Sequence, residues 1–424
     1  MSVARVVDLF SGAGGLAEGF RQAGFAVVAG TDVDPDACST FRLNFPEAET
    51  VWGDIRTAGV KTRVLRAACD ADVIVGGPPC QAFSQVRNHS RLIDDPRNSL
   101  YREFVEIVGT SGPKAFVMEN VPGLEQMGVK EQVLSDLELG GDYRVRAQVV
   151  DAADFGVPQT RKRIIFIGVH RSIGKEPPTL VGTGATDALA LARFNGSYPI
   201  RYRVCRTKAS AHAWLDRLVD PEDVSVVTAE QAIGDFVRLR PGTRVDATRS
   251  KELPEPTSAY QRLMRSGLGE LVFNTSVPRI NPDTVIRLRE IPKGGNHRDL
   301  PETLLERYLT GARWGPDAGN GRLSRRHYYA YRRLHPRFWC WTLNTKADSV
   351  YHYASPRALS VREFARIQSF PDRFVFTTDP RPGSLPGRIT GGSAHSRYRQ
   401  VGNAVPPLLA AAIATALRST LFAS

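Results

Sequence analysis

Cysteine is scarce in this chain of 424 residues. The five cysteines, at positions 38, 69, 80, 205 and 340, are odd in number and form no C-x-x-C pair. This pattern argues against a disulfide framework and a zinc site, so no metal is expected, and it is typical of a reducing cytoplasm. No apolar run approaches the roughly 18 residues that a membrane-spanning helix needs. The first residues enter a strand-like run directly, so we expect neither a signal peptide nor a membrane segment.

The dinucleotide fingerprint G-x-G-x-x-G is also missing, which disfavours a nicotinamide enzyme. In its place, a turn of small residues, 11–16, separates a strand expected over residues 5–10 from a helix expected over residues 17–23. A glycine turn between a strand and a helix N-terminus lets a cofactor approach backbone N–H groups. By itself such a turn is a weak signal.

Acidic residues are in the minority. The chain has 56 Lys and Arg against 44 Asp and Glu, a formal charge of +12 and a pI of about 9.7. Residues 1–172 carry a net charge of −3, residues 173–355 carry +9 and residues 356–424 carry +6. A basic region beside a near-neutral one suggests a polyanionic partner, most simply nucleic acid. A basic surface without such a partner is the alternative that charge alone leaves open.

The stretch Gly76–Ser84 combines a strand end with a stiff corner. An apolar run before it predicts a buried parallel strand, which two glycines and two prolines stop abruptly. Cys80 therefore follows at the carboxyl end of a strand, where open α/β sheets bind their ligands. Taken alone, such a cysteine is more often a buried thiol than a reactive one. The long polar stretch 84–100 after it is interpreted as a lid.

Acidic residues follow three other expected strands. Asp32 is placed to accept hydrogen bonds from ribose hydroxyls, and Asp54 from an exocyclic amine. Glu119 would face the same crevice. Asp34 or Asp36 is expected to cap the helix that follows the second strand.

The βα pattern ends near residue 172. Before that point, residues 144–150 and 164–169 are expected to form an antiparallel pair, with basic residues between them that could equally be surface charge. Between residues 322 and 341, cations interleave with aromatics, which suits contact with phosphates and bases. Those aromatics could also be a small core, which we expect of Trp339 and Trp341. Ser360 and Glu363 form a capping box that predicts a helix over residues 361–368.

Six motifs occur in a recognisable order. They are Asp8–Gly15, Gly77–Ser84, Glu119–Val121, Gln159–Arg163, Val361–Glu363 and Arg399–Val405. In this order and together, they make the chain resemble the cytosine carbon-5 DNA methyltransferases of bacterial restriction–modification type. The resemblance covers residues 5–172 and 356–417 and leaves the basic middle unmatched.

The resemblance implies an α/β fold with a doubly wound, mostly parallel sheet, as in S-adenosylmethionine-dependent methyltransferases. A second, smaller and irregular domain would recognise the target. The expected catalytic domain comprises residues 1–172 and 397–424, the target-recognition domain residues 173–355, and a hinge region residues 356–396. Duplex DNA would lie between the two domains with one cytosine flipped out.

The resemblance also assigns the chemistry. Cytosine carbon 5 becomes nucleophilic after a thiolate adds to carbon 6, and Cys80 is expected to supply that thiolate. Glu119 would neutralise the charge at N3, protonated or sharing a proton with the base. Arg163, with Arg161 nearby, would be the fixed cation for the ring oxygen and the phosphates. No side chain is assigned to remove the carbon-5 proton, and water could do so.

The implied cofactor is S-adenosyl-L-methionine. Asp32 would bind the ribose and Asp54 the adenine amine, while Val33 occupies a position that usually packs on the adenine and is aliphatic here. The full predicted set is Phe10, Ser11, Gly12, Gly14, Gly15, Leu16, Asp32, Val33, Asp54, Ile55, Pro79, Asn403 and Val405.

The predicted DNA contacts come mostly from polar and basic side chains in four stretches. They are Gln81, Ser84, Val86, Arg87, Arg91, Arg97, Lys162, Lys293, Asn296, Arg298, Arg325, Arg326, Arg332 and Arg333. The chain is thus expected to be a sequence-specific DNA (cytosine-5)-methyltransferase of a restriction–modification system. We expect a monomer in the bacterial cytoplasm, associated with the nucleoid through DNA, with a cognate restriction endonuclease as an indirect partner.

The sequence is less consistent with two alternative functions. An RNA methyltransferase of the same fold is expected to have a short recognition region. The long basic region 173–355 argues against this alternative. A catalytically inactive DNA-binding regulator is disfavoured by intact Cys80, Glu119 and Arg163. The recognised DNA sequence cannot be read from one chain.

Overall fold

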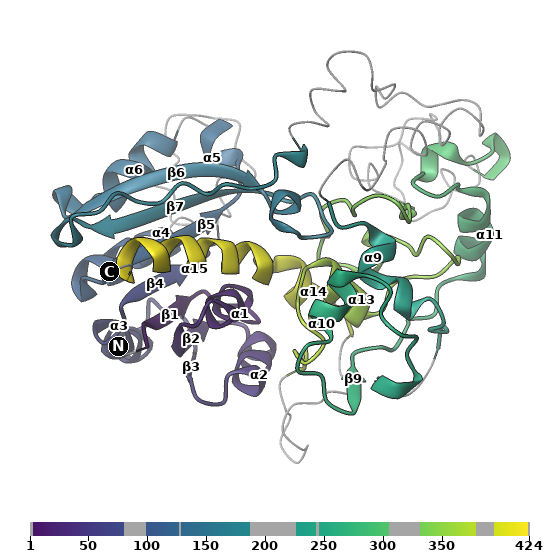
Figure 1. The fold of residues 1–424 in the computed structure, drawn as a ribbon, viewed down its shortest axis with the longest axis horizontal. Coiled ribbons are helices and arrows are strands. Elements are labelled where there is room, and N and C mark those ends of the chain that lie inside the picture. Colours follow the sequence, from purple (N-terminus) through teal and green to yellow (C-terminus); the bar gives the residue numbers. More distant parts are fainter. Residues whose placement is uncertain are drawn as a thin grey trace. The chain divides into compact units, whose positions relative to one another are not determined.

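The computed structural model describes residues 3–79, 99–126, 129–186, 226–242, 246–304, 331–378 and 394–422. The chain divides into two compact units (Figure 1). The first comprises Met1–Phe155, Arg161–Thr183 and Phe374–Ser424, and the second comprises Gly156–Thr160 and Gly184–Arg373. The change from the second unit back to the first falls at Phe374, inside the segment expected to be a hinge. The functional roles of the predicted domains stay predictions.

A seven-stranded sheet forms the centre of the first unit, among the described residues. Its order is β3-β2-β1-β4-β5-β7-β6. The strands are β1 (Arg5–Leu9), β2 (Ala26–Asp32), β3 (Glu49–Trp52), β4 (Val73–Gly76), β5 (Ala115–Asn120), β6 (Tyr143–Asp151) and β7 (Lys162–His170). Neighbours among β1 to β5 pair in parallel, while β7 is antiparallel to both β5 and β6. The predicted doubly wound, mostly parallel sheet is confirmed.

Helices cover both faces of this sheet. They are α1 (Gly15–Gln22), α2 (Pro35–Asn44), α3 (Ala58–Cys69), α4 (Ser99–Ser111), α5 (Gly123–Gln126), α6 (Lys130–Leu137), α14 (Ala394–Asn403) and α15 (Pro407–Phe422). The Asp34 side chain caps α2 by accepting a hydrogen bond from the Asp36 backbone N–H at 3.1 Å, which decides between the two predicted caps.

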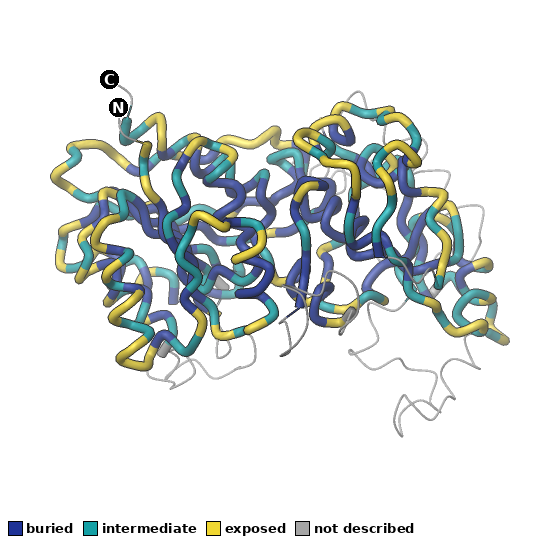
Figure 2. Tube along the Cα trace, turned by 90° about the horizontal axis from the view of Figure 1, so that it is seen from below, coloured by how far each residue is buried: buried dark blue, intermediate teal, exposed yellow. Residues whose placement is uncertain are grey.

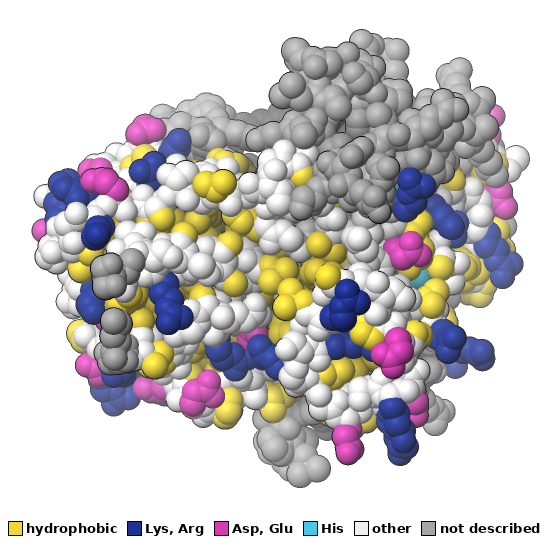
Figure 3. Space-filling model, viewed as in Figure 1, with side chains coloured by type: hydrophobic (Ala, Val, Ile, Leu, Met, Phe, Trp, Pro, Cys, Tyr) yellow, Lys and Arg dark blue, Asp and Glu magenta, His cyan; other side chains and the backbone are white. Residues whose placement is uncertain are grey.

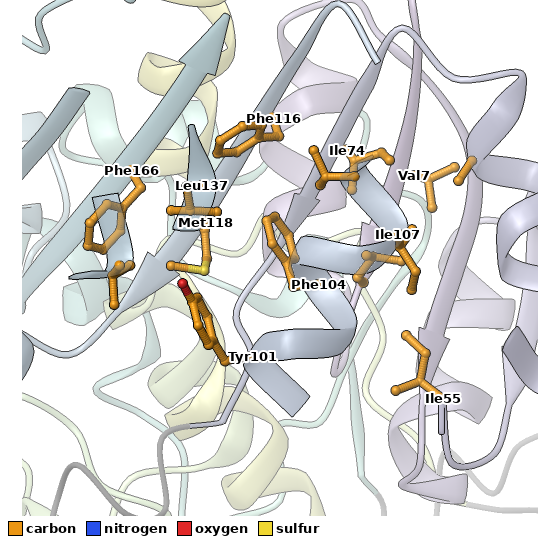
Figure 4. Packing of buried hydrophobic residues seen from close by; sticks show 14 of the residues in the cluster. Val7, Ile55, Ile74, Tyr101, Phe104, Ile107, Phe116, Met118, Leu137 and Phe166 are labelled. Carbon is orange, nitrogen blue, oxygen red and sulfur yellow. The ribbon is translucent and has the colours of Figure 1, made fainter. Parts of the chain in front are cut away.

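The main hydrophobic core lies between the sheet and the helices α3, α4 and α6. Sheet residues such as Ile74 and Phe116 pack there against Phe104 and Ile107 of α4 (Figure 4). The Phe104 and Phe116 rings meet edge to face with centroids 6.1 Å apart. Figure 2 shows the result along the chain, with buried residues in the interior of the unit and exposed ones in the connecting turns.

The C-terminal helix α15 packs against α1. A Cβ added at Gly19 of α1 would lie 2.4 Å from the Cβ of Ala410, so the glycine permits close helix contact. The stretch His395–Phe422, which includes α15, is long and apolar enough by length and composition to cross a membrane. Because Leu409, Ile413 and Leu417 are fully buried in the protein, α15 has the burial of a core helix.

Four helices of the first unit, α3, α5, α6 and α14, were not predicted. Helix α3 buries few side chains, Val64 and Ala68, so its apolar stripe is weak. Helix α14 buries polar side chains, among them Ser396 and Gln400, so hydrophobic periodicity could not reveal it.

The second unit consists of short elements. Its helices are α9 (Ala229–Ile233), α10 (Ala259–Met264), α11 (Pro282–Glu290) and α13 (Val361–Ile367), and the strands β8 (Ala247–Arg249) and β9 (Leu271–Phe273) pair antiparallel. The predicted capping box at the start of α13 is confirmed, because the side chains of Ser360 and Glu363 each bond the other's backbone N–H. Helix α13 is buried on all sides, charged residues included.

Arginines on and before α13 form ion pairs with carboxylates inside the second unit. Arg366 donates to both oxygens of Asp372 at 2.6 Å and to the oxygens of Asp235 at 3.1 and 3.2 Å. Arg357 forms a two-bond pair with Glu363 at 2.7 and 2.8 Å. Because removing one partner would leave a buried charge unpaired, these pairs fix how the segments around α13 pack.

Candidate active site

Glu119 and Arg163 form an ion pair at the carboxyl end of β5. Glu119 is on β5 and Arg163 is on the adjacent antiparallel strand β7. The Nε of Arg163 lies 2.6 Å from Oε1 of Glu119, and the Arg163 and Glu119 side chains are 14% and 13% exposed. The ion pair is therefore largely desolvated but still accessible, which suits charge-assisted recognition of a ligand.

The corner that leads to Cys80 is tied to the same strand end. A Cβ at Gly77 would lie 3.1 Å from Oε2 of Glu119, so the backbone of the corner passes beside that carboxylate. Asn120 donates from Nδ2 to the carbonyl of Pro78 at 3.3 Å. Asn120 was missed as a site residue, although its place directly after Glu119 was a signal. The predicted acid is thus held beside the segment that carries the predicted nucleophile.

Several predicted residues lie outside the described residues. These are Cys80, Gln81, Ser84, Val86, Arg87, Arg91, Arg97, Arg325 and Arg326, together with most of the expected lid. The distance between Cys80 and Glu119 therefore stays a prediction. Pro79, the last described residue before Cys80, is exposed.

Arg161, the second predicted catalytic cation, is buried. Its Nη2 donates to the carbonyl of Gly402 at 2.9 Å, and its backbone N–H donates to Asp151 at 2.8 Å. Burial, assisted by the nearby Arg163, lowers the pKa of Arg161 to about 9. Arg161 therefore fastens β7 to the C-terminal segment, while Arg163 holds Glu119. Lys162 between them is exposed.

The first glycine turn is built onto the end of β2. Asp32 accepts from the backbone N–H groups of Gly12 and Asp34, each at 2.8 Å and each on a different carboxylate oxygen. The Val33 backbone N–H also interacts with this carboxylate, whose roughly four acceptor positions leave room for a further donor such as a ribose hydroxyl. Burial raises the pKa of Asp32. The Ser11 backbone N–H and hydroxyl both donate to the carbonyl of Thr31, at 2.9 and 3.3 Å.

Phe10 connects β1 to this turn in an unusual backbone conformation. Its φ is +57°, in the left-handed region that a bulky side chain rarely adopts. The hydrogen bonds of Ser11 and Gly12 to the end of β2 hold the chain there. Backbone strain of this kind concentrates at ligand sites, where it costs on the order of 1–3 kcal/mol.

The turn has the shape that a cofactor requires. Gly12 has a φ of +52°, and no atom lies within 4 Å of a Cβ added there, so the space above it is open. Gly15 instead packs against the C-terminal segment, since its Cβ would lie 2.2 Å from the carbonyl of Val405. Gly14 also has a positive φ, and Asn403 is exposed. These residues fit a cofactor that is bound through backbone groups and Asp32.

The remaining predicted cofactor residues divide into buried and exposed ones. Leu16 and Ile55 are buried and support the turn and the end of β3. Asp54 lies near the surface and already accepts hydrogen bonds from the Arg56 backbone and guanidinium, which lowers the pKa of Asp54. Val33 is 65% exposed.

Some of the predicted DNA-contacting residues of the second unit are bonded within the protein, and others are exposed. Arg333 donates to the carbonyls of Leu288, Ile291 and Tyr353 at 2.6–3.2 Å, which favours a structural role over DNA contact. Arg332 lies over the Trp341 ring at 5.3 Å. Lys293 is exposed.

Other members of this predicted set are less informative. Asn296 is half-buried and its backbone N–H donates to Asp299, while nothing of the Arg298 side chain is described. Figure 3 shows Lys and Arg side chains spread over the drawn face among Asp and Glu rather than gathered in one patch.

Among the described residues, no group of three or more His, Cys, Asp and Glu is arranged to hold a metal ion.

The mostly parallel seven-stranded sheet with helices on both faces is the fold of S-adenosylmethionine-dependent methyltransferases. The crystal structure of a candidate DNA modification methyltransferase encoded within a prophage (E. coli) superposes with a TM-score of 0.63. The two are 24% identical, and the match covers 99% of each chain, which shows the shared fold.

The sequence family described as C-5 cytosine-specific DNA methylase matches residues 4–208 and 278–419. Type II methyltransferase M1.HphI of Haemophilus parahaemolyticus is 32% identical over 97% of this chain and 86% of its own length. Type II methyltransferase M.NgoFVII of Neisseria gonorrhoeae is 31% identical over 95% of this chain and 83% of its own length. The chain belongs to the C-5 cytosine-specific DNA methylases.

The predicted family, activity and cofactor are thereby confirmed. The protein is a DNA (cytosine-5-)-methyltransferase that uses S-adenosylmethionine, and the reaction of this family proceeds through a covalent cysteine adduct. The roles of individual residues in this chain stay predictions.

Proposed function

We propose that this chain is the modification enzyme of a restriction–modification system and methylates one cytosine within a specific duplex sequence. The similarity to type II methyltransferases over nearly the whole chain supports this role. We further propose that the protein acts as a monomer in the cytoplasm, associates with the nucleoid through DNA, and is paired with an endonuclease of the same specificity.

The observation that carries the proposed chemistry is the Glu119–Arg163 ion pair beside the corner that leads to Cys80. In this proposal the Cys80 thiolate forms a bond to carbon 6 of the flipped cytosine. The displaced electron pair is accommodated as N3 takes a proton shared with Glu119, which leaves an electron-rich carbon 5. S-adenosylmethionine, when bound, supplies the methyl group for carbon 5.

Arg163 has two functions in this proposal. It orients the Glu119 carboxyl group through its Nε, and further N–H groups of its guanidinium are available for the ring oxygen. In the last step the carbon-5 proton leaves to water, the sulfur–carbon 6 bond breaks, and the N3 proton returns to Glu119. The recognition surface is proposed to lie in the second unit, with exposed Lys293 as a member.

Methyl incorporation into unmethylated plasmid DNA tests the proposed nucleophile. Cys80→Ser is expected to abolish incorporation, because a neutral hydroxyl does not replace a thiolate as nucleophile. Cys69→Ser is the matched control, since Cys69 is exposed in the first unit. If Cys80→Ser retains wild-type incorporation, the proposed mechanism is wrong.

The proposed biological role has its own test. Bisulfite sequencing of plasmid from an expressing host should show methylation confined to one short sequence. Methylation scattered over unrelated sequences would contradict a restriction–modification role.

A further inference from the structure

Trp52 is an exposed tryptophan at the carboxyl edge of the sheet. It is the last residue of β3, and its side chain is 59% exposed although the preceding Val51 is fully buried. Val33, which directly follows the end of β2, is 65% exposed. Two large apolar side chains therefore face solvent at the ends of adjacent parallel strands, β2 and β3.

The indole is fixed in place. Its Nε1 donates to the carbonyl of Val33 at 3.1 Å, so the polar atom of the ring is satisfied by the backbone that follows β2. The backbone N–H of Gly53 donates to the carbonyl of Asp32 at 3.0 Å and ties the two strand ends together. With its N–H bonded, the ring offers apolar surface and needs no further polar partner.

The residues around the indole are the two acids assigned to the cofactor. Asp32 is paired with Trp52 in the β2–β3 register, and Asp54 follows two residues after Trp52. The exposed Val33 and Trp52 side chains therefore lie on the same strand ends as Asp32, the predicted ribose ligand. Ligand sites combine apolar and aromatic walls with a few placed polar groups, and this edge supplies both.

We propose that Trp52 supplies the aromatic surface against which the adenine ring of the cofactor packs, since position 33 carries the aliphatic Val33. The proposal rests on the proposed placement of the cofactor at Asp32 and Asp54. Flat aromatic rings are preferred partners for a purine because both offer π-faces.

Equilibrium binding of S-adenosylhomocysteine tests the proposal without any methyl transfer. Isothermal titration calorimetry should give at least a tenfold weaker Kd for Trp52→Ala, which is about 1.4 kcal/mol. Trp52→Phe, which keeps an aromatic face, should stay within about threefold of the wild type, and Trp52→Leu should fall between the two. Val181→Ala is the matched control, because Val181 is an exposed apolar residue of the same unit and should leave the Kd unchanged.

Moving the aromatic ring sharpens the test. The double variant Val33→Trp with Trp52→Ala should recover part of the lost affinity. Trp52 is also the only tryptophan in residues 1–183 and 374–424, so ligand-dependent quenching of tryptophan fluorescence should be reduced in Trp52→Phe.

The outcomes distinguish a wrong cofactor site from a wrong role for Trp52. If the wild type fails to bind S-adenosylhomocysteine, the proposed cofactor site itself is wrong. If the wild type binds and Trp52→Ala, folded by circular dichroism, binds equally well, the role of Trp52 is wrong while the cofactor site stands. Equal weakening by Trp52→Ala and Trp52→Phe would also overturn the aromatic contact.

Discussion

Arg163 in the first unit and Arg366 in the second are both paired with carboxylates, but in different surroundings. Arg163 meets one carboxylate, Glu119, and both side chains remain partly accessible. Arg366 is fully buried and meets Asp235 and Asp372 as well as the carbonyl of Ala232. An arginine saturated by internal acceptors can only hold the fold, whereas one with a single carboxylate and access to solvent keeps donors for a substrate.

The largest expected loss of stability belongs to Arg366. Arg366→Met should destabilise the protein by about 3–5 kcal/mol, because it removes the cation that bonds both buried carboxylates. Asp235 would keep Arg265, but Asp372 would keep only Arg362, at 4.0 Å. Urea unfolding followed by circular dichroism measures this change. Arg289→Met, which removes an exposed arginine of the same unit, should change the unfolding free energy by less than about 0.5 kcal/mol. A loss below about 1 kcal/mol for Arg366→Met would show that the buried network does not hold the unit.

Arg163 should show the opposite pattern. Arg163→Met is expected to lower the methylation rate by roughly 10²–10³-fold, as for other preorganised groups that stabilise developing charge. The loss of stability should be smaller than for Arg366→Met, because it leaves one partly accessible carboxylate, Glu119, without its cation. Arg163→Lys keeps the charge but loses the planar fork and should rescue the rate incompletely. Comparable losses of stability for Arg163→Met and Arg366→Met would remove the distinction between them.

Asp8 offers a pH-dependent test in the first unit. It is fully buried on β1, and burial raises its pKa well above the usual value, although the Ala17 backbone N–H donates to it. As pH rises above about 4, the unfolded chain loses the Asp8 proton before the folded protein does, so stability falls until the folded-state pKa is passed.

Asn at position 8 cannot ionise and can still accept the Ala17 hydrogen bond. The stability of Asp8→Asn relative to the wild type should therefore increase with pH, by about 1.4 kcal/mol for each unit of the pKa shift. Chemical unfolding at pH 5 and pH 8 measures the difference. Asp70→Asn, at an exposed position, is the control, and its unfolding free energy should change with pH as that of the wild type does. The same pH dependence for Asp8→Asn and the wild type would contradict the prediction.

The smallest effect is expected at Arg399. Its Nη2 donates to Asp34 at 2.7 Å, but half of the Arg399 side chain is exposed. Such pairs contribute about 0–1 kcal/mol and weaken with salt. Arg399→Ala should therefore lower the unfolding free energy by less than about 1 kcal/mol, and by still less in 1 M salt. A decrease of several kcal/mol in the unfolding free energy would contradict this and indicate that the Arg399–Asp34 pair stabilises the protein as the buried arginine pairs do.

Much of the first unit could be predicted because its strands are short apolar runs that end in punctuating residues. Strand β4 is buried throughout, and its abrupt stop before Pro78 and Pro79 was visible in the sequence. The capping side chains of Asp34 and Ser360 were predictable for the same reason, since a cap is a local pattern. The family motifs then placed Glu119 beside Arg163.

The roles of individual cations could not be predicted in the same way. Arg161, Arg163 and Arg333 look alike in the sequence, and each of them could bind phosphate. Burial separates them: Arg161 bonds the carbonyl of Gly402, Arg333 bonds three carbonyls, and Arg163 bonds a carboxylate. Trp52 was missed because a single tryptophan at a strand end carries no periodic signal, and its partner Val33 is close through sheet pairing rather than in sequence.

The measurement that tests the central claim most directly is the methylation rate of Glu119→Gln, taken together with its affinity for unmethylated plasmid DNA. Gln keeps the size of the side chain but cannot exchange a carboxyl proton with N3. The account predicts a rate at least roughly 10²-fold below the wild type, with DNA affinity within a few fold. Unchanged methylation, or an equal loss of rate and affinity, would contradict a catalytic role for the Glu119–Arg163 pair.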